Sequence, residues 1–441
     1  MNAKWHKHLP ESLRTKMKIH LGLEAVIGNM GWLFVDKFIR LGAGLFVGAW
    51  IARYLGPEQF GLLNFSIAFA ALVGIMANLG LDGIVVRDLV KSPSRQNELL
   101  GSAFVLKVIG GVITILISIA LITLLHGRER LTVWLVCLAA SAYIFQSLNV
   151  IDFFFQSKVQ SRYTVFAANG AFVSMTLVKV FLVITGAHLL AFAWATLGEG
   201  ALTAVFLVVS YRHTHHNFRD WRYDRSVANE LLRDSWPLLF AGLAVILYMR
   251  LDVVMLQQMA GDREVGIYAA ATRISEVWYF LPTVIVSSVS PSIIECHRLN
   301  PDLYIKRIRH LYSLMTWLAI GLSLPISLSS TWIVQLLYGP QFKEAGPVLA
   351  VHLWASVAVF LGVASSQHLI VEHLQKISFY RTLIGVACNI MLNLALIPKF
   401  GAMGAAIATV VSYFLGTFSM IVFKPTRAHT MYLLMAPFGR P

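Results

Sequence analysis

A long series of apolar segments limits the folds open to this chain more than any other feature. Each segment has about 20 residues, the length of helix that crosses about 30 Å of hydrocarbon. Backbone groups in lipid must pair within the same element, so such segments fold as membrane-spanning helices. We predict an all-α polytopic membrane protein with about twelve spans, at residues 31–53, 61–82, 100–125, 131–155, 162–185, 188–211, 236–259, 265–293, 311–337, 345–370, 377–397 and 403–423.

The composition agrees with a membrane setting. Hydrophobic residues make up 57% of the 441 residues, charged residues make up 13%, and the mean hydropathy is +0.68. These values argue against a large soluble enzyme. The three cysteines, Cys137, Cys296 and Cys388, are too scattered to predict a disulfide framework or a metal site. The sequence has no Walker motif and no nucleophile–base constellation, so we expect a protein that is not an enzyme and needs no cofactor.

Lysine and arginine are distributed unequally between the two sides of the predicted membrane. The side with both termini carries 24 of the 36 lysines and arginines, the opposite loops carry five, and seven lie within spans. The positive-inside rule therefore predicts that both termini are cytoplasmic. The net charge of +14 is a topology signal that favours contact with anionic headgroups and not with nucleic acid. The basic N-terminus lacks the apolar core of a cleaved signal peptide, and residues 12–27 are expected to form an interfacial helix.

Two echoes in the sequence predict two similar halves. GPEQFG at 56–61 and GDREVG at 261–266 are 205 residues apart, and both read Gly-x-x-x-apolar-Gly, a pattern for a tight turn between helices. The dipeptide AT recurs at 195–196 and 408–409, which are 213 residues apart. We expect two six-helix lobes around a central cavity. The predicted parts are an N-terminal interfacial segment, a first lobe, a basic cytoplasmic linker, a second lobe and a cytoplasmic tail, at residues 1–30, 31–211, 212–235, 236–423 and 424–441.

Ionisable residues inside the spans indicate a functional cavity, because a charge at the middle of a bilayer costs about 2.5–3.5 kcal/mol on insertion scales. Arg250 in the seventh span and Arg273 in the eighth lie equally far from the outer ends of their segments, so we expect two guanidinium groups at one depth. Glu276 is one turn from Arg273 and can pair with it. Asp252 points away from Arg250, so one of these two would face the cavity and the other a neighbouring helix.

Charged residues of the other spans complete the candidate set. Asp36, Lys37 and Arg40 form a charged face on the first span, and Glu199 lies alone near the middle of the sixth. We assign the cationic substrate-binding cavity to Arg250, Arg273, Arg40, Lys37 and Lys179. We assign ion coupling or charge balance to Asp252, Glu276, Glu199 and Asp36.

Structural roles are the alternative for several of these residues. Lys107 and Lys179 lie nearer the ends of their spans, where a lysine can snorkel to the interface. The pairs Asp36–Arg40 and Arg273–Glu276 can hold helices together as ion pairs, and Glu199 can be a protonated, hydrogen-bonded carboxyl group.

The spans carry a slight excess of positive charge, which predicts an anionic substrate. Arginine suits phosphate because its planar fork binds two oxygens at once, so a pyrophosphate-like group is the best fit. An exporter of organic cations would instead need an acidic cavity. The outer loops are too short to hold a site for sugar polymerisation or ligation, which argues against a membrane enzyme.

Five stretches resemble the polysaccharide-transport family of the MOP superfamily, whose members include Wzx-type flippases for O-antigen and related lipid-linked oligosaccharides. The resemblance extends from about residue 30 to 423. Its most specific motifs are the Arg-x-Leu-Asp of the seventh span and an Asn-x-x-x-Asn…Pro…Gly-x-x-Gly-Ala-Ala run. The five stretches are ARYLGPEQFGLLNFSIAFA (52–70), LGLDGIVVRDLV (79–90), NVIDFFFQSKVQSRY (149–163), YMRLDVVMLQQMAGDREVGIYAAATRISE (248–276) and NIMLNLALIPKFGAMGAAIAT (389–409).

The resemblance implies a MATE-like, V-shaped pair of six-helix lobes enclosing a cationic cavity. It implies a flippase that moves an undecaprenyl-pyrophosphate-linked oligosaccharide to the outer leaflet by alternating access, for lipopolysaccharide O-antigen, capsule or exopolysaccharide. It further implies the bacterial inner membrane as location, H⁺ or Na⁺ as candidate coupling ions, and a polysaccharide polymerase with chain-length machinery as candidate partners. The competing interpretations are a MATE-type ion-coupled antiporter of organic cations and an enzyme or scaffold of glycan assembly.

Overall fold

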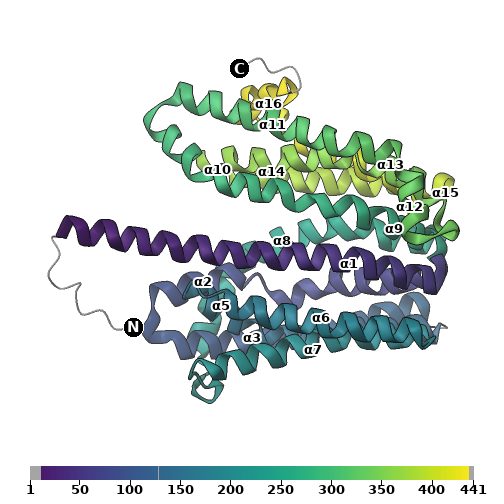
Figure 1. The fold of residues 1–441 in the computed structure, drawn as a ribbon, viewed down its shortest axis with the longest axis horizontal. Coiled ribbons are helices and arrows are strands. Elements are labelled where there is room, and N and C mark those ends of the chain that lie inside the picture. The colour runs from purple at the N-terminus through teal and green to yellow at the C-terminus, as the bar shows by residue number, and fades with distance from the viewer. Residues whose placement is uncertain (1–10, 128, 437–441) are drawn as a thin grey trace.

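The computed structural model describes residues 11–127 and 129–436, with side chains from Arg40 onward. Within these residues the chain forms helices and no strand, so the predicted all-α class is confirmed. Figure 1 shows two groups of roughly parallel helices that meet at one end and diverge toward the other. This arrangement is the V-shaped pair of lobes that the family resemblance implies.

Seven α-helices of the described residues build the first lobe. Its interior contains buried aliphatic and aromatic residues such as Leu100, Val150 and Phe154. The helices are α1 (Glu11–Asn78), α2 (Asp82–Lys91), α3 (Gln96–His126), α4 (Arg130–Phe145), α5 (Val150–Ser157), α6 (Arg162–Ile184) and α7 (Leu189–His213). The 3₁₀ segment η3 (Gln146–Asn149) separates α4 from α5 inside the predicted fourth span.

The second lobe contains the remaining helices and has its own core, which includes Tyr312, Met315 and Phe360. The helices are α8 (Arg225–Ala260), α9 (Asp262–Glu276), α10 (Phe280–Leu299), α11 (Pro301–Leu328), α12 (Ser330–Tyr338), α13 (Ala345–His352), α14 (Ala355–Val371), α15 (Gln375–Phe418) and α16 (Arg427–Leu434). The first turns of α8 pack on the first lobe, because Val227 and Leu231 are buried there with Leu99.

Ten stretches of the described chain are long and apolar enough to cross a membrane, compared with twelve predicted spans. Two of the ten, Arg40–Lys91 and Gln375–Val422, have 52 and 48 residues, about twice the length that one crossing needs. Each turns back at a glycine with non-helical backbone angles, Gly56 (φ 75°, ψ 170°) and Gly401 (φ 53°, ψ −130°). In each turn the glycine is the one residue with non-helical backbone angles, so the two helices follow each other without a loop. Each of these stretches therefore corresponds to two predicted spans.

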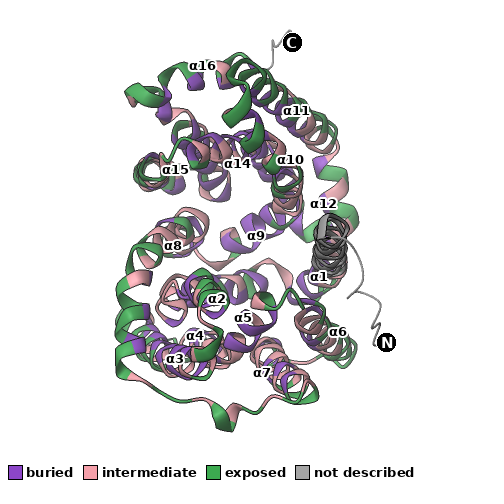
Figure 2. Ribbon diagram, turned by 90° about the vertical axis from the view of Figure 1, so that its left-hand side faces the viewer, coloured by how far each residue is buried: buried purple, intermediate pink, exposed green. Residues whose placement is uncertain are grey.

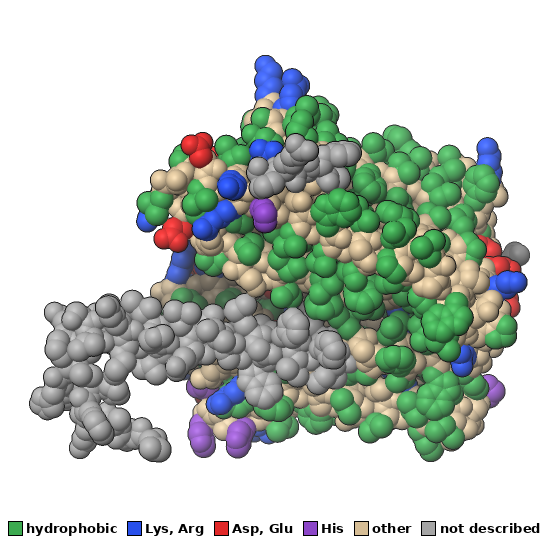
Figure 3. Space-filling view, turned by 45° about the horizontal axis from the view of Figure 1, so that its top comes forward, with side chains coloured by type: hydrophobic (Ala, Val, Ile, Leu, Met, Phe, Trp, Pro, Cys, Tyr) green, Lys and Arg blue, Asp and Glu red, His purple; other side chains and the backbone are tan. Residues whose placement is uncertain are grey.

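Figure 3 shows hydrophobic side chains over most of the described surface on one side of the molecule, with charged side chains mainly near its edges. Large apolar residues of this kind include Leu116, Phe181 and Trp317, which are 62%, 63% and 57% exposed. In Figure 2, viewed from the end at which the lobes diverge, exposed positions lie on the outward sides of the helices. An apolar exterior of this size suits contact with lipid.

The two Gly-x-x-x-apolar-Gly turns pack against each other and close one end of the molecule, which we call the hairpin end. A methyl group added to Gly61 would lie 1.8 Å from the carbonyl oxygen of Asp262, and one added to Gly266 would lie 1.9 Å from that of Pro57. Residues 57 and 262, like residues 61 and 266, occupy corresponding positions of the two repeats. The contact is therefore reciprocal, as in a two-fold symmetric interface.

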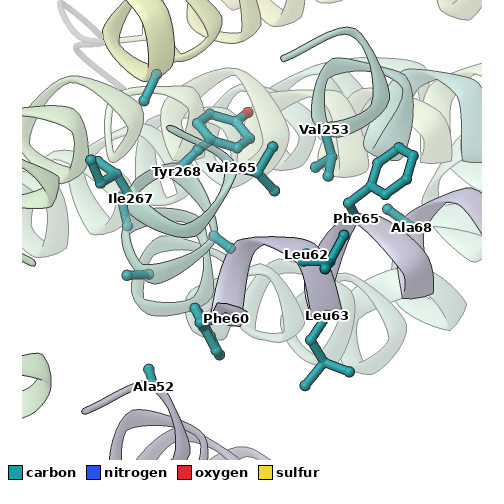
Figure 4. Packing of buried hydrophobic residues seen from close by; sticks show 14 of the residues in the cluster. Ala52, Phe60, Leu62, Leu63, Phe65, Ala68, Val253, Val265, Ile267 and Tyr268 are labelled. Atoms are coloured by element: carbon teal, nitrogen blue, oxygen red, sulfur yellow. The ribbon is translucent and has the colours of Figure 1, made fainter. Parts of the chain in front are cut away.

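Further contacts between the lobes reinforce the hairpin end. The Arg53 guanidinium donates to the carbonyl oxygen of Leu336, and Gln341 Nε2 donates to the carbonyl oxygen of Arg53 at 2.7 Å. The rings of Phe60 and Phe342 pack edge to face with centroids 6.0 Å apart. Figure 4 shows the adjoining apolar cluster, in which Leu62 and Phe65 of α1 gather with Val253, Val265 and Tyr268 from α8 and α9.

Candidate functional site

A cavity of about 250 Å³, which we call the cation pocket, lies in the first lobe near the hairpin end. Helices α1, α6 and α7 supply most of its wall, and one residue, Arg273, reaches in from α9 of the second lobe. The pocket therefore belongs to both lobes. Its lining is Gly44, Val47, Gly48, Ile51, Phe60, Leu63, Asn64, Ile67, Phe172, Thr176, Lys179, Phe192, Thr196, Glu199 and Arg273.

Arg273 is positioned by two residues of α1. Its guanidinium lies over the ring of Phe60, with 5.8 Å between its central carbon and the ring centroid. A methyl group on Gly48 would come within 2.2 Å of Arg273 Nη1, so the glycine leaves room for the guanidinium in this position. The sequence predicts that Arg273 lies in the cavity but indicates no role for Gly48, because no local pattern shows which helix crosses α9.

Lys179 and Glu199 form an ion pair across α6 and α7, with 2.8 Å between Nζ and Oε2. Their side chains are 19% and 25% exposed, so the pair is largely shielded but open to the pocket. Glu199, which lies alone in its predicted span, thus balances Lys179. Arg40 lies 5.4 Å from the ring of Phe172, which also lines the pocket. Among the described lining residues, Lys179 and Arg273 share one carboxylate, that of Glu199, so the pocket carries excess positive charge.

Arg250 lies in the second lobe, away from the cation pocket. Its Nη2 is 3.7 Å from Oε2 of Glu276, and the two side chains are 39% and 26% exposed. Glu276 therefore approaches Arg250, and the expected pair with Arg273 is not the one that the structure shows. The two guanidinium groups are not neighbours in one site, because Arg273 crosses to the first lobe.

Asp252 is buried between α8, α9 and α15. The Tyr268 hydroxyl donates to Asp252 Oδ2, the Thr409 hydroxyl lies 3.4 Å from the same oxygen, and the Val253 amide donates to Oδ1 at 2.8 Å. Asp252 and Arg250 thus have different neighbours, as their i,i+2 spacing requires. In this arrangement Asp252 joins three helices of the second lobe.

Three other charged residues that the sequence singles out are Asp36, Lys37 and Lys107. The side chains of Asp36 and Lys37 lie outside the described residues. Lys107 does not snorkel to the interface but is 2% exposed. Its Nζ donates to Asn78 Oδ1 at 2.9 Å and to Asp82 Oδ1 at 3.3 Å, which fixes the junction of α1, α2 and α3.

A further cation of the second lobe is Arg381 of α15. It lines a second cavity, of about 270 Å³, between α8, α14 and α15. Its guanidinium donates to the hydroxyls of Ser365 and Ser366, both at 2.8 Å, and to the carbonyl oxygen of Gly362 at 3.1 Å. These acceptors are neutral, so the structure adds one more, half-buried positive charge to the second lobe.

The described part of the chain contains no group of three or more His, Cys, Asp or Glu side chains that could hold a metal ion. The polar chemistry of the cavities is therefore that of guanidinium, ammonium, carboxylate, amide and hydroxyl groups.

Comparison with known proteins identifies the family. A model of the family described as polysaccharide biosynthesis protein matches residues 26–297, well over half of the chain. The chain belongs to the polysaccharide biosynthesis protein family. The resemblance predicted from its sequence motifs is thereby confirmed.

Relatives of this chain align over much of its length. A probable flippase, AglR of Haloferax volcanii, is 29% identical over 58% of this chain and 53% of its own length. The capsular polysaccharide biosynthesis protein CapF of Staphylococcus aureus is 18% identical over 90% of this chain and 99% of its own length.

Solved structures confirm the fold of this family member. The lipid II flippase MurJ in an inward closed conformation superimposes with a TM-score of 0.72 at 14% identity, covering 93% of this chain and 91% of that one. An inward-facing MATE multidrug transporter of the MOP superfamily gives 0.69 at 15% identity, covering 92% and 99%. At these identities the likeness establishes the shared two-lobe architecture.

Proposed function

We propose that this chain is a flippase that carries a lipid-linked oligosaccharide across a membrane and holds its pyrophosphate in the cation pocket. The observation that carries the proposal is the excess of positive charge at membrane depth. Arg273 and Lys179 meet Glu199 in a pocket shared by both lobes. Unbalanced charge is costly in a membrane and marks a substrate pathway.

Chemistry supports phosphate as the group that fills the pocket. The guanidinium of Arg273 offers a planar fork for two phosphate oxygens, and the Lys179 ammonium adds a point charge. Relatives and structural neighbours include proteins named as flippases and one named for capsular polysaccharide biosynthesis. A cation exporter would instead need a pocket with excess negative charge.

The finer assignment follows from the family resemblance. The substrate is an undecaprenyl-pyrophosphate-linked repeat unit, moved from the cytoplasmic to the outer leaflet of the bacterial inner membrane for surface polysaccharide. Both termini are cytoplasmic, which places the hairpin end on the outer side. Alternating access would open that end after the substrate has bound.

H⁺ or Na⁺ coupling would use a carboxylate of the set Glu199, Glu276, Asp252 and Asp36.

Reconstitution tests the proposal directly. The purified protein is placed in liposomes with a fluorescent undecaprenyl-pyrophosphate oligosaccharide, and exposure of the label in the other leaflet is followed with and without an ion gradient. Arg273→Ala should slow transport at least about tenfold, because a hydrogen bond to a charged group contributes about 1.5–3 kcal/mol.

Arg263→Ala is the matched control, since Arg263 is also an arginine of α9 but pairs with Glu344 at the protein surface. We expect its transport to stay within about twofold of the wild-type rate, as for most surface substitutions. Equal transport by Arg273→Ala and wild-type protein would contradict the pocket assignment. Uptake of organic cations without movement of any glycan lipid would favour the antiporter.

A further inference from the structure

A third cavity, of about 450 Å³, adjoins the cation pocket inside the first lobe. We call it the amide pocket, and its polar lining consists of Tyr143, Gln146, Asn149, Thr196, Glu199 and Thr203. Ile67, Thr196 and Glu199 line both cavities, so one ligand can extend from one into the other.

Two carboxamides of the amide pocket have no hydrogen-bond partner among the described residues. Gln146 and Asn149 begin and end η3, the 3₁₀ segment that interrupts the fourth span. Side chains three residues apart in a 3₁₀ helix lie on the same face. Neither carboxamide makes a hydrogen bond to a described residue. Gln146 nevertheless lies deep in its span, 16 residues or about 24 Å from Arg130 at the start of α4. Polar groups at such depth must face water or a polar ligand.

The remaining walls of the amide pocket define what that ligand can be. Glu199 is neutralised by Lys179, so the pocket presents no net charge of its own. Each carboxamide offers both a donor and an acceptor, the combination that pairs with neighbouring hydroxyl groups or with an acetamido group. The ring of Tyr143 adds an apolar face, and it has room because residue 74 is glycine, where a methyl group would lie 2.3 Å from the ring. A neutral polyhydroxylated group fits these walls.

We propose that the amide pocket binds the sugar next to the anionic group of the substrate, with Gln146 and Asn149 hydrogen-bonding to its hydroxyl or acetamido groups. This inference rests on the proposed function and makes it more specific. The cation pocket supplies the anion site, and the adjoining carboxamides supply selectivity for a glycosyl phosphate over a phosphate that carries no sugar.

Binding of soluble probes to the full-length protein in detergent tests the inference. The probes are inorganic phosphate and the 1-phosphates of glucose, galactose, mannose and N-acetylglucosamine, with affinity measured by calorimetry. The wild-type protein should bind at least one sugar phosphate about tenfold more tightly than phosphate, the gain expected from two neutral hydrogen bonds. In Gln146→Leu/Asn149→Leu this preference should fall below about twofold, while the affinity for phosphate stays unchanged.

Two further variants make the outcomes distinguishable. Gln375→Leu, at an exposed position that begins α15, should keep the wild-type preference. Arg273→Ala should lose affinity for every probe. If the double variant is not monodisperse, Asn149→Ala alone should lower the preference by about threefold, the effect of one neutral hydrogen bond.

Wild-type protein that binds sugar phosphates no more tightly than phosphate, or a preference that survives removal of both carboxamides, would overturn the inference. In that case a loss of phosphate binding in Arg273→Ala would still support the proposed anion site. Equal phosphate affinity in wild-type protein and Arg273→Ala would instead count against the proposed function.

Discussion

Arg250 and Asp252 illustrate at the residue scale how charges are accommodated within a predicted span. They are two positions apart on α8, and the structure gives them separate environments. Arg250 faces Glu276 at 3.7 Å, whereas Asp252 accepts hydrogen bonds from side chains of two neighbouring helices. Because each charge has its own partners, the cost of placing it in the membrane is offset locally.

The hydrogen bonds of Asp252 predict how two substitutions differ. Asp252→Ala leaves the buried hydroxyl of Tyr268 without its carboxylate acceptor and should destabilise the protein by about 1–3 kcal/mol. Asp252→Asn keeps an acceptor oxygen and should destabilise it less. Thermal unfolding in detergent, followed by tryptophan fluorescence, measures both. Equal unfolding temperatures for the two variants would contradict this account. A stable Asp252→Asn variant that has lost gradient-driven transport would identify Asp252 as a coupling carboxylate.

The sequence indicated which charged residues lie inside the membrane but not all of their partners. The depth of Arg273 follows from its distance to the outer end of the eighth predicted span, whereas its contact with Gly48 depends on how the two lobes cross. The Lys179–Glu199 pair was also hidden, because Lys179 is five residues from the end of α6 and Glu199 is ten from the start of α7. The long lysine side chain spans this difference in depth.

At the element scale, the glycine turns explain why twelve predicted spans correspond to ten continuous helical stretches in the structure. The hydropathy pattern identified twelve apolar segments, and the structure joins four of them in pairs through Gly56 and Gly401. The echo of GPEQFG and GDREVG indicated matching turns, but spacing alone cannot show that the turns touch. The break at η3 is not predicted because residues 140–152 contain neither proline nor glycine, and only the polar residues Gln146, Ser147 and Asn149 mark it.

The reciprocal turn contact predicts the effect of filling it. Gly61→Ala and Gly266→Ala each place a methyl group against a carbonyl oxygen of the opposite lobe, so the hairpin end cannot close as in this structure. We expect a shift toward conformations that are open at this end. Spin labels at the exposed positions Arg130 and Lys343, in a variant without native cysteines, should report a longer mean distance by double electron–electron resonance.

Gly83→Ala and Gly321→Ala serve as controls for the turn glycines, because a methyl group at either position meets no atom within 4 Å. Their distance distributions should match that of the labelled parent protein. Unchanged distributions in both turn variants would show that the closed hairpin end adapts to a methyl group.

At the scale of the whole molecule, the position of Arg273 connects substrate binding to movement of the lobes. Its helix, α9, belongs to the second lobe and forms the closed hairpin end through Gly266, while its guanidinium lies in a pocket of the first lobe. Separation of the lobes at the hairpin end would therefore withdraw Arg273 from Lys179. The anion site would be complete when this end is closed and weakened when it opens, which suits release of the substrate on that side.

This arrangement predicts that a bridge across the hairpin end stops transport. Arg53 and Gln341 come from opposite lobes and are hydrogen-bonded neighbours, so cysteines at these positions can be joined by a short, reducible bis-maleimide. In liposomes, the bridged Arg53→Cys/Gln341→Cys protein should flip glycan lipid at the protein-free rate, and reduction of the linker should restore transport. The same reagent should leave each single-cysteine variant active, because one attachment does not tie the lobes together. Transport by the bridged protein would mean that the substrate leaves without opening this end, and the withdrawal of Arg273 would then play no part in its release.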